Sequence, residues 1–156
     1  MNTVISLKNI SKTYSQGNVQ ALKNISIDIE KGDFVAIMGH SGSGKSTLMN
    51  ILGCLDKSDD GKYFLDDVDV MNLKGKEIAK VRNSKIGFVF QSFNLIKTDT
   101  ALENVERPLM YCEKSVAERK NRAEELLEKM GLGERKIIFR LNFQVVSSRE
   151  LQLLVQ

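Results

Sequence analysis

Residues 34 to 52 read F-V-A-I-M-G-H-S-G-S-G-K-S-T-L-M-N-I-L, and this stretch decides the fold class of the chain. Within it, residues 39–46 match the phosphate-loop pattern G-x-x-x-x-G-K-[ST] at every fixed position. The apolar, partly β-branched run 34–38 predicts a short buried strand, and residues 47–52 predict the beginning of a helix. The glycines are therefore expected where a strand turns into a helix. A Gly/Ser-rich turn that matches the pattern by chance is the alternative.

Such a loop binds phosphate for physical reasons. Glycines let the backbone turn successive N–H groups inward, at the positive end of the helix dipole. Lys45 is then expected to reach the β- and γ-phosphates, and the Ser46 hydroxyl to supply one Mg²⁺ ligand. The residues expected to bind nucleotide here are Gly39, His40, Ser41, Gly42, Ser43, Gly44, Lys45, Ser46 and Thr47. The predicted fold class is an α/β phosphate-loop nucleoside triphosphatase, with Lys45 as a catalytic residue.

Composition limits the other possibilities. A chain of 156 residues with 42% apolar residues can bury one core, so a single domain is expected. The 23 basic and 20 acidic residues form no basic block, so no nucleic-acid partner is predicted. Cys54 and Cys112 lack a metal-binding spacing and are expected to be free thiols in a reducing cytosol. No apolar run approaches the roughly 20 residues that span a bilayer.

The remaining elements follow from hydrophobic periodicity and turn signals. Strands are predicted at residues 4–10, 21–30, 62–65 and 86–90, helices at 77–83 and 115–130, and a polar loop at 11–18. Ser115 is expected to cap the last helix, because Glu118 follows it three residues later. No internal repeat is present.

Two further stretches identify a particular kind of phosphate-loop protein. Tyr14 lies in S-K-T-Y-S-Q-G ahead of the loop, and the run I-G-F-V-F-Q-S-F-N-L places Gln91 at the end of a predicted strand. The segment T-A-L-E-N-V follows. Over residues 1 to about 136 the chain resembles the nucleotide-binding subunit of ABC transporters, in the branch that includes macrolide-export and lipoprotein-releasing ATPases. Residues 1–136 would be the N-terminal part of that ABC-type domain.

The resemblance implies roles for these residues. Tyr14 looks like the aromatic side chain that stacks on adenine, although a tyrosine packed at a domain edge is the alternative. Gln91 looks like the glutamine that joins Ser46 in the Mg²⁺ shell and orients the attacking water, which would make it catalytic; a strand-end glutamine is the alternative. ATP and Mg²⁺ are therefore the implied cofactors.

Partners are implied as well. Residues 92–110 would receive a coupling helix of a membrane-spanning permease subunit, which would keep the protein at the cytoplasmic face of the cell membrane. Phe93, Leu95, Ile96 and Leu109 could equally form local core. Intact family members form homodimers around two ATP molecules. Lys97 and Arg107 depart from the usual family pattern in this segment without touching the phosphate chemistry.

The resemblance stops near Lys136. Residues after it lack the L-S-G-G-Q signature, the Asp-Glu pair and the switch histidine, so the chain alone is expected to turn over little ATP. Residues 143–156 can be back-translated so that a one-base shift reads L-S-G-G-Q-Q-Q-R-V-A-I-A-R-A. We therefore expect residues 137–156 to be an out-of-frame tail. The function expected is ATP-driven export; a non-catalytic nucleotide-binding remnant and a non-transport ABC ATPase are the alternatives.

Overall fold

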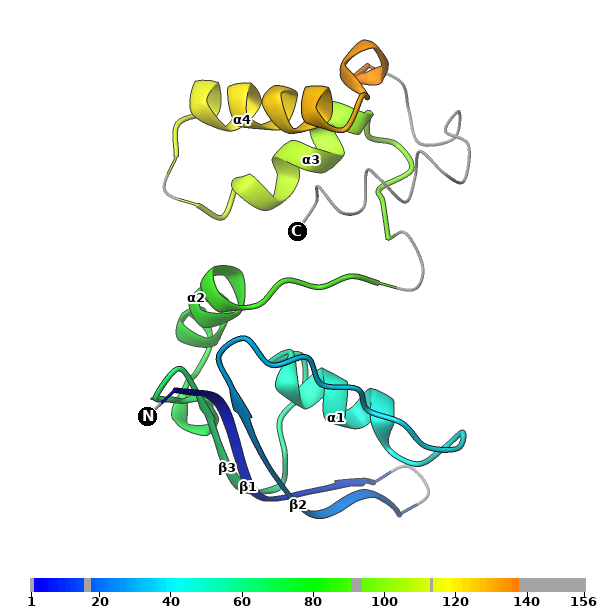
Figure 1. Ribbon diagram of the computed structural model, residues 1–156, viewed down its shortest axis with the longest axis vertical. Coiled ribbons are helices and arrows are strands. Elements are labelled where there is room, and N and C mark those ends of the chain that lie inside the picture. The colour runs from blue at the N-terminus through cyan, green and yellow to red at the C-terminus, as the bar shows by residue number, and fades with distance from the viewer. Residues whose placement is uncertain (1, 16–17, 91–93, 113, 138–156) are drawn as a thin grey trace. The chain divides into compact units, whose positions relative to one another are not determined.

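The structure is a computed structural model that describes residues 2–15, 18–90, 94–112 and 114–137 (Figure 1). The chain divides into two compact units, residues 1–86 and 87–156. Each has its own hydrophobic cluster, so the described residues form two cores where the sequence predicted one.

The first unit is built on an antiparallel sheet with the strand order β2-β1-β3-β4. Its strands are β1 (Thr3–Tyr14), β2 (Val19–Glu30), β3 (Asp60–Leu65) and β4 (Val68–Asp69). The helices are α1 (Lys45–Leu52), the 3-10 turn η1 (Val70–Asn72) and α2 (Lys76–Lys85). Leu48 and Ile51 of α1 pack with the buried side chains of β1 and β3, so the helix after the phosphate loop is fixed against the sheet.

Strand β1 carries a bulge that the sequence pattern did not predict. Leu7 and Ile10 are both fully buried, although residues three apart lie on opposite faces of a regular strand. The pairing register shifts between them, and Asn9 adopts a φ of 53°. A bulge that adds one residue returns both side chains to the same face. The strand also continues to Tyr14, so the polar loop predicted at residues 11–18 is wrong over its first four residues.

The second unit is helical in its described part. It contains α3 (Ala101–Leu109), α4 (Val116–Lys129) and the 3-10 turn η2 (Gly133–Arg135). Both α-helices begin with a capping box, formed by Thr100 with Glu103 and by Ser115 with Glu118. The predicted helix at residues 115–130 is therefore confirmed, whereas α3 was not predicted.

Two predicted strands are absent. Residues 34–38 and 86–90 are irregular, and the side chain of Phe34 is 97% exposed and that of Val89 is 69% exposed. A buried parallel strand needs hydrogen-bonding neighbours on both sides. No described strand pairs with either segment, so their apolar sequences are not buried in a sheet.

Candidate functional site

The phosphate-loop sequence forms an open turn that leads directly into α1. Residues 40–44 are turn and bend, and Gly44 is the N-cap of the helix, with a φ of 88°. Gly44 has no side chain that could cap the helix, and the first intrahelical bond runs from the Leu48 amide to the Gly44 carbonyl at 2.9 Å. The amides of residues 45–47 therefore have no acceptor within the helix. They are available to an anion at the positive end of the helix dipole.

Lys45 folds back over this turn. Its ammonium lies 2.8 Å from the Gly39 carbonyl oxygen, 2.6 Å from the His40 carbonyl oxygen and 3.3 Å from the Ser43 hydroxyl oxygen. These bonds hold a positive charge against the loop that precedes the uncapped amides of residues 45–47. Ser46, one residue later, is an exposed residue that carries a hydroxyl group. The donor set suits a phosphate group with a bound divalent cation, because it combines an ammonium, backbone amides and a hydroxyl oxygen.

Two glycines of the loop are required for different reasons. Gly42 has a φ of 78°, and a Cβ placed on it would meet nothing within 4 Å, so only the backbone conformation demands glycine there. A Cβ on Gly44 would lie 2.4 Å from the carbonyl oxygen of Ala21 in β2. The start of α1 thus touches the sheet backbone directly. Gly39 differs from the prediction, because its φ is not positive; a Cβ there would instead lie 2.6 Å from the Ser43 hydroxyl oxygen.

Tyr14 is the last residue of β1 and is 37% exposed. Its backbone partner across the hairpin is Val19, two residues before Ala21, where β2 meets Gly44. The sheet therefore places the tyrosine at the same end of β2 as the phosphate loop. The Tyr14 hydroxyl donates to the Asp56 carboxylate at 3.1 Å.

The remaining predicted site residues fall into two groups. His40, Ser41 and Ser43 are exposed in the loop, with His40 Nδ1 2.8 Å from the Ser41 carbonyl oxygen, and Thr47 is buried in α1. Gln91 lies outside the described residues, so its role beside Ser46 stays a prediction. Among the described part of the chain, no three His, Cys, Asp or Glu side chains gather as a metal site.

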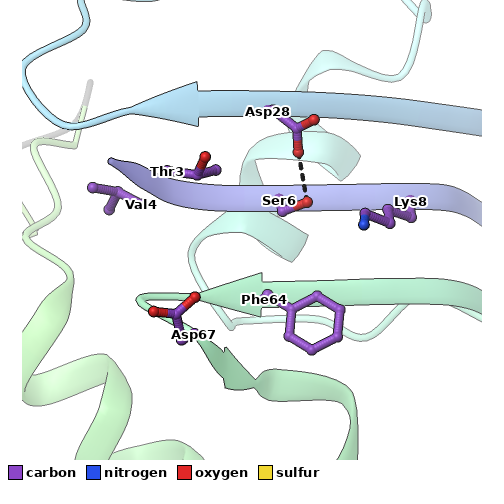
Figure 2. Close-up of a pocket in the computed structure, with 7 residues that line it drawn as sticks. All are labelled: Thr3, Val4, Ser6, Lys8, Asp28, Phe64 and Asp67. Carbon is purple, nitrogen blue, oxygen red and sulfur yellow. Dashed lines mark hydrogen bonds between the residues drawn. The ribbon is translucent and has the colours of Figure 1, made fainter. Parts of the chain in front are cut away.

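A shallow pocket lies elsewhere in the first unit, on the open face of the sheet (Figure 2). None of its lining residues belongs to the phosphate loop. Ser6 donates to Asp28 at 2.5 Å across it, so two of its polar side chains already satisfy each other. We assign it no ligand.

Sequence reasoning also missed Asp56, whose contact with Tyr14 spans 42 residues and leaves no local signal.

Comparison with known proteins gives the family. The profile of the ABC transporter family matches residues 22–154. The chain belongs to the ABC transporter ATP-binding family. It is 51% identical over 134 residues to an uncharacterized ABC transporter ATP-binding protein, YvrO, of Bacillus subtilis. It is 54% identical over 134 residues to the macrolide export ATP-binding/permease protein MacB of Brucella abortus. The predicted family is thus confirmed, and macrolide-export proteins of the MacB type are among the relatives that the chain matches.

Solved structures confirm the α/β phosphate-loop fold of the ABC type. The dimeric structure of MJ0796, a bacterial ABC transporter cassette, has a TM-score of 0.84 and 43% identity, and the match covers 97% of this chain and 68% of that one. The structure of MJ0796 in a post-hydrolysis state with ADP and Pi has a TM-score of 0.83 and 42% identity. Among curated relatives, the chain covers 58% of YvrO and 21% of MacB, so it corresponds to part of those proteins.

Proposed function

We propose that this chain binds MgATP as the nucleotide-binding part of an ABC transporter ATPase. The observation that carries the proposal is the pairing of the Lys45 ammonium, held inside the loop, with the uncapped amino end of α1. An ammonium and several free amides directed to one place stabilise a polyphosphate far better than either does alone. The relative MJ0796, solved with ADP and Pi, supports the same ligand class.

Different residues of the site are expected to bind the phosphates, the Mg²⁺ ion and the adenine base. The amides of residues 45–47, that of the buried Thr47 included, and the Lys45 ammonium hold the β- and γ-phosphates. Ser46 and Gln91 are the expected protein ligands of Mg²⁺, which supplies positive charge that neutralises the phosphates when bound. Gln91 is also expected to orient the attacking water. Tyr14 offers an exposed ring on which adenine can stack.

Transport is the proposed use of this binding. By analogy with MacB and the MJ0796 dimer, the protein would form a head-to-tail homodimer and drive export through a permease subunit, at the cytoplasmic face of the membrane. None of the helices in the described residues is long and apolar enough to cross a membrane. The segment after Gln91 remains the proposed permease contact, although Leu95 there is buried in the second core, as the local-core alternative expects. Co-purification of a membrane-spanning subunit supports transport over a cytosolic ABC ATPase.

Residues 137–156 are proposed to be an out-of-frame tail, because the shifted reading restores the family signature. In that case the purified 156-residue chain binds ATP and hydrolyses little of it, the behaviour of a nucleotide-binding remnant. Resequencing the gene from the Met130 codon past the Gln156 codon tests this directly. A base that restores L-S-G-G-Q, followed by Asp-Glu and a histidine, supports the proposal. An unaltered frame with ATPase activity that Lys45→Ala abolishes contradicts it.

Binding itself is tested by equilibrium dialysis with MgATP. Lys45→Ala should weaken affinity by about tenfold to a hundredfold, the range expected for one charge-assisted hydrogen-bonding group. Lys23→Ala is the matched control, because Lys23 is an exposed lysine of β2 in the same unit. Equal affinity of the two variants would contradict the proposed site.

A further inference from the structure

The Asp56 carboxylate accepts hydrogen bonds both from Tyr14, the proposed adenine-stacking residue, and from the neighbouring Lys12. The Tyr14 hydroxyl donates to Asp56 Oδ2 at 3.1 Å, and the Lys12 ammonium donates to Asp56 Oδ1 at 3.0 Å. Lys12 also donates to the Lys57 carbonyl at 2.6 Å. The two oxygens of Asp56 therefore fix two side chains of β1 at once.

Lys12 completes the arrangement by lying over the ring itself. Its ammonium is 5.4 Å from the centroid of the Tyr14 ring, within cation–π range. A base that stacks on this ring must use the face opposite Lys12. The cation and the hydroxyl bond together restrict both torsions of the tyrosine side chain, so its ring is held in one orientation before any base arrives.

Asp56 is itself anchored to the helix that carries the phosphate loop. Its backbone amide donates to the Asn50 carbonyl in α1 at 3.2 Å, and the Lys57 amide donates to Asp56 Oδ1 at 2.7 Å. Burial tends to raise the pKa of the Asp56 carboxyl, but the hydrogen bonds from Lys12, Lys57 and Tyr14 outweigh it and leave that pKa below its usual value. The carboxylate therefore stays charged and anchored at neutral pH.

These contacts join two parts of the site that are distant in sequence. Tyr14 belongs to β1 and the phosphate loop to the start of α1, and Asp56 connects the tyrosine to the far end of that helix. We propose that Asp56, with Lys12, is a positioning residue that preorganises Tyr14 for stacking on the base of the nucleotide. This inference rests on the proposed function, in which Tyr14 contacts adenine.

The test separates base binding from phosphate binding by titrating the full chain with MgATP and with magnesium tripolyphosphate, which lacks a base. Tyr14→Phe keeps the ring and removes only the hydroxyl that meets Asp56. Asp56→Asn keeps the shape of the side chain and removes the nearer of the two carboxylate charges that pair with Lys12, the other being that of Asp59. Each is expected to weaken ATP binding about threefold to tenfold and to leave tripolyphosphate binding unchanged, because only the ordering of the ring is lost.

A double variant and a control make the result specific. Tyr14→Phe combined with Asp56→Asn should bind ATP about as tightly as the weaker-binding single variant, because the two changes share the contact between Tyr14 and Asp56. Asp67→Asn is the matched control: Asp67 is an aspartate of the same unit that lies in the turn between β3 and β4, and this variant should bind both ligands as the unaltered protein does.

The possible results separate the positioning role of Asp56 from the proposed binding of MgATP. If Tyr14→Ala weakens ATP binding but Tyr14→Phe and Asp56→Asn do not, the stacking role of Tyr14 is supported and the positioning role of Asp56 is overturned. If Asp56→Asn weakens both ligands equally, Asp56 supports the phosphate loop or the fold, which also overturns it. Failure of the unaltered chain to bind either ligand refutes the proposed function, and the inference with it.

Discussion

Replacing Gly44 with alanine should damage the first unit more than the same change at Gly42. Both glycines have a positive φ, of 88° and 78°, which costs alanine about 1–2 kcal/mol. Alanine recovers roughly 0.4–1 kcal/mol by restricting the unfolded chain, so Gly42→Ala should cost about 1 kcal/mol. At Gly44 the new Cβ also meets the Ala21 carbonyl oxygen at 2.4 Å and Leu22 Cδ2 at 3.0 Å.

Backbone against backbone cannot relax as a flexible side chain can, so overpacking adds about 1–3 kcal/mol. Gly44→Ala should therefore lower the free energy of unfolding of the first unit by about 2–4 kcal/mol. Urea unfolding followed by tyrosine fluorescence measures this unit alone in a Tyr111→Phe background, because the two remaining tyrosines, Tyr14 and Tyr63, both belong to it. Equal destabilisation by the two glycine variants would refute the close approach of α1 to β2.

Three further predictions concern other groups. Asn104 is 3% exposed and bonds four backbone groups ahead of α3, so Asn104→Ala should destabilise the second unit by about 2–4 kcal/mol in urea unfolding followed by circular dichroism; an unchanged midpoint would contradict this. Hydrogen bonds from Lys129 and Arg122 on α4 lower the pKa of Glu125 to about 2. The ionised Glu125 therefore contributes its full stabilisation of the folded state above the ordinary glutamate pKa near 4.5, and this contribution is lost as the pH falls through about 2. When helix content is followed during acid titration, the unaltered chain should lose this contribution as the pH falls, and Glu125→Gln should not show that loss. Burial raises the pKa of the Cys54 thiol, so iodoacetamide should label the less buried Cys112 at least about tenfold faster until denaturant is added; equal labelling rates in the folded chain would contradict this.

Features that depend on nearby residues were the ones the sequence could predict. The phosphate loop and the beginning of α1 follow from glycine spacing and a lysine within eight residues. The capping box of Ser115 and Glu118 predicted α4, and the same signal was present for α3. T-A-L-E places Glu103 three residues after Thr100, so a systematic search for this pattern would have found the helix.

Features that depend on distant partners could not be predicted in this way. Residues 34–38 have the composition of a buried strand, but strand formation requires neighbours that the described residues do not provide. The bulge at Asn9 is equally invisible, because it depends on pairing with β2. The contact between Tyr14 and Asp56 joins the end of a strand to a loop beyond α1, and no local pattern marks it.

The central claim is that the loop from Gly39 to Thr47 is where this chain holds the phosphates of ATP. Hydrogen exchange measured with and without MgATP tests this claim, because the amides of residues 45–47 have no acceptor within α1 and should be protected when an anion accepts their hydrogen bonds. We expect MgATP to slow exchange at residues 42–47 in the unaltered chain and not in Lys45→Ala. No added protection there, or protection confined to the sheet-face pocket around Ser6 and Asp28, would contradict it.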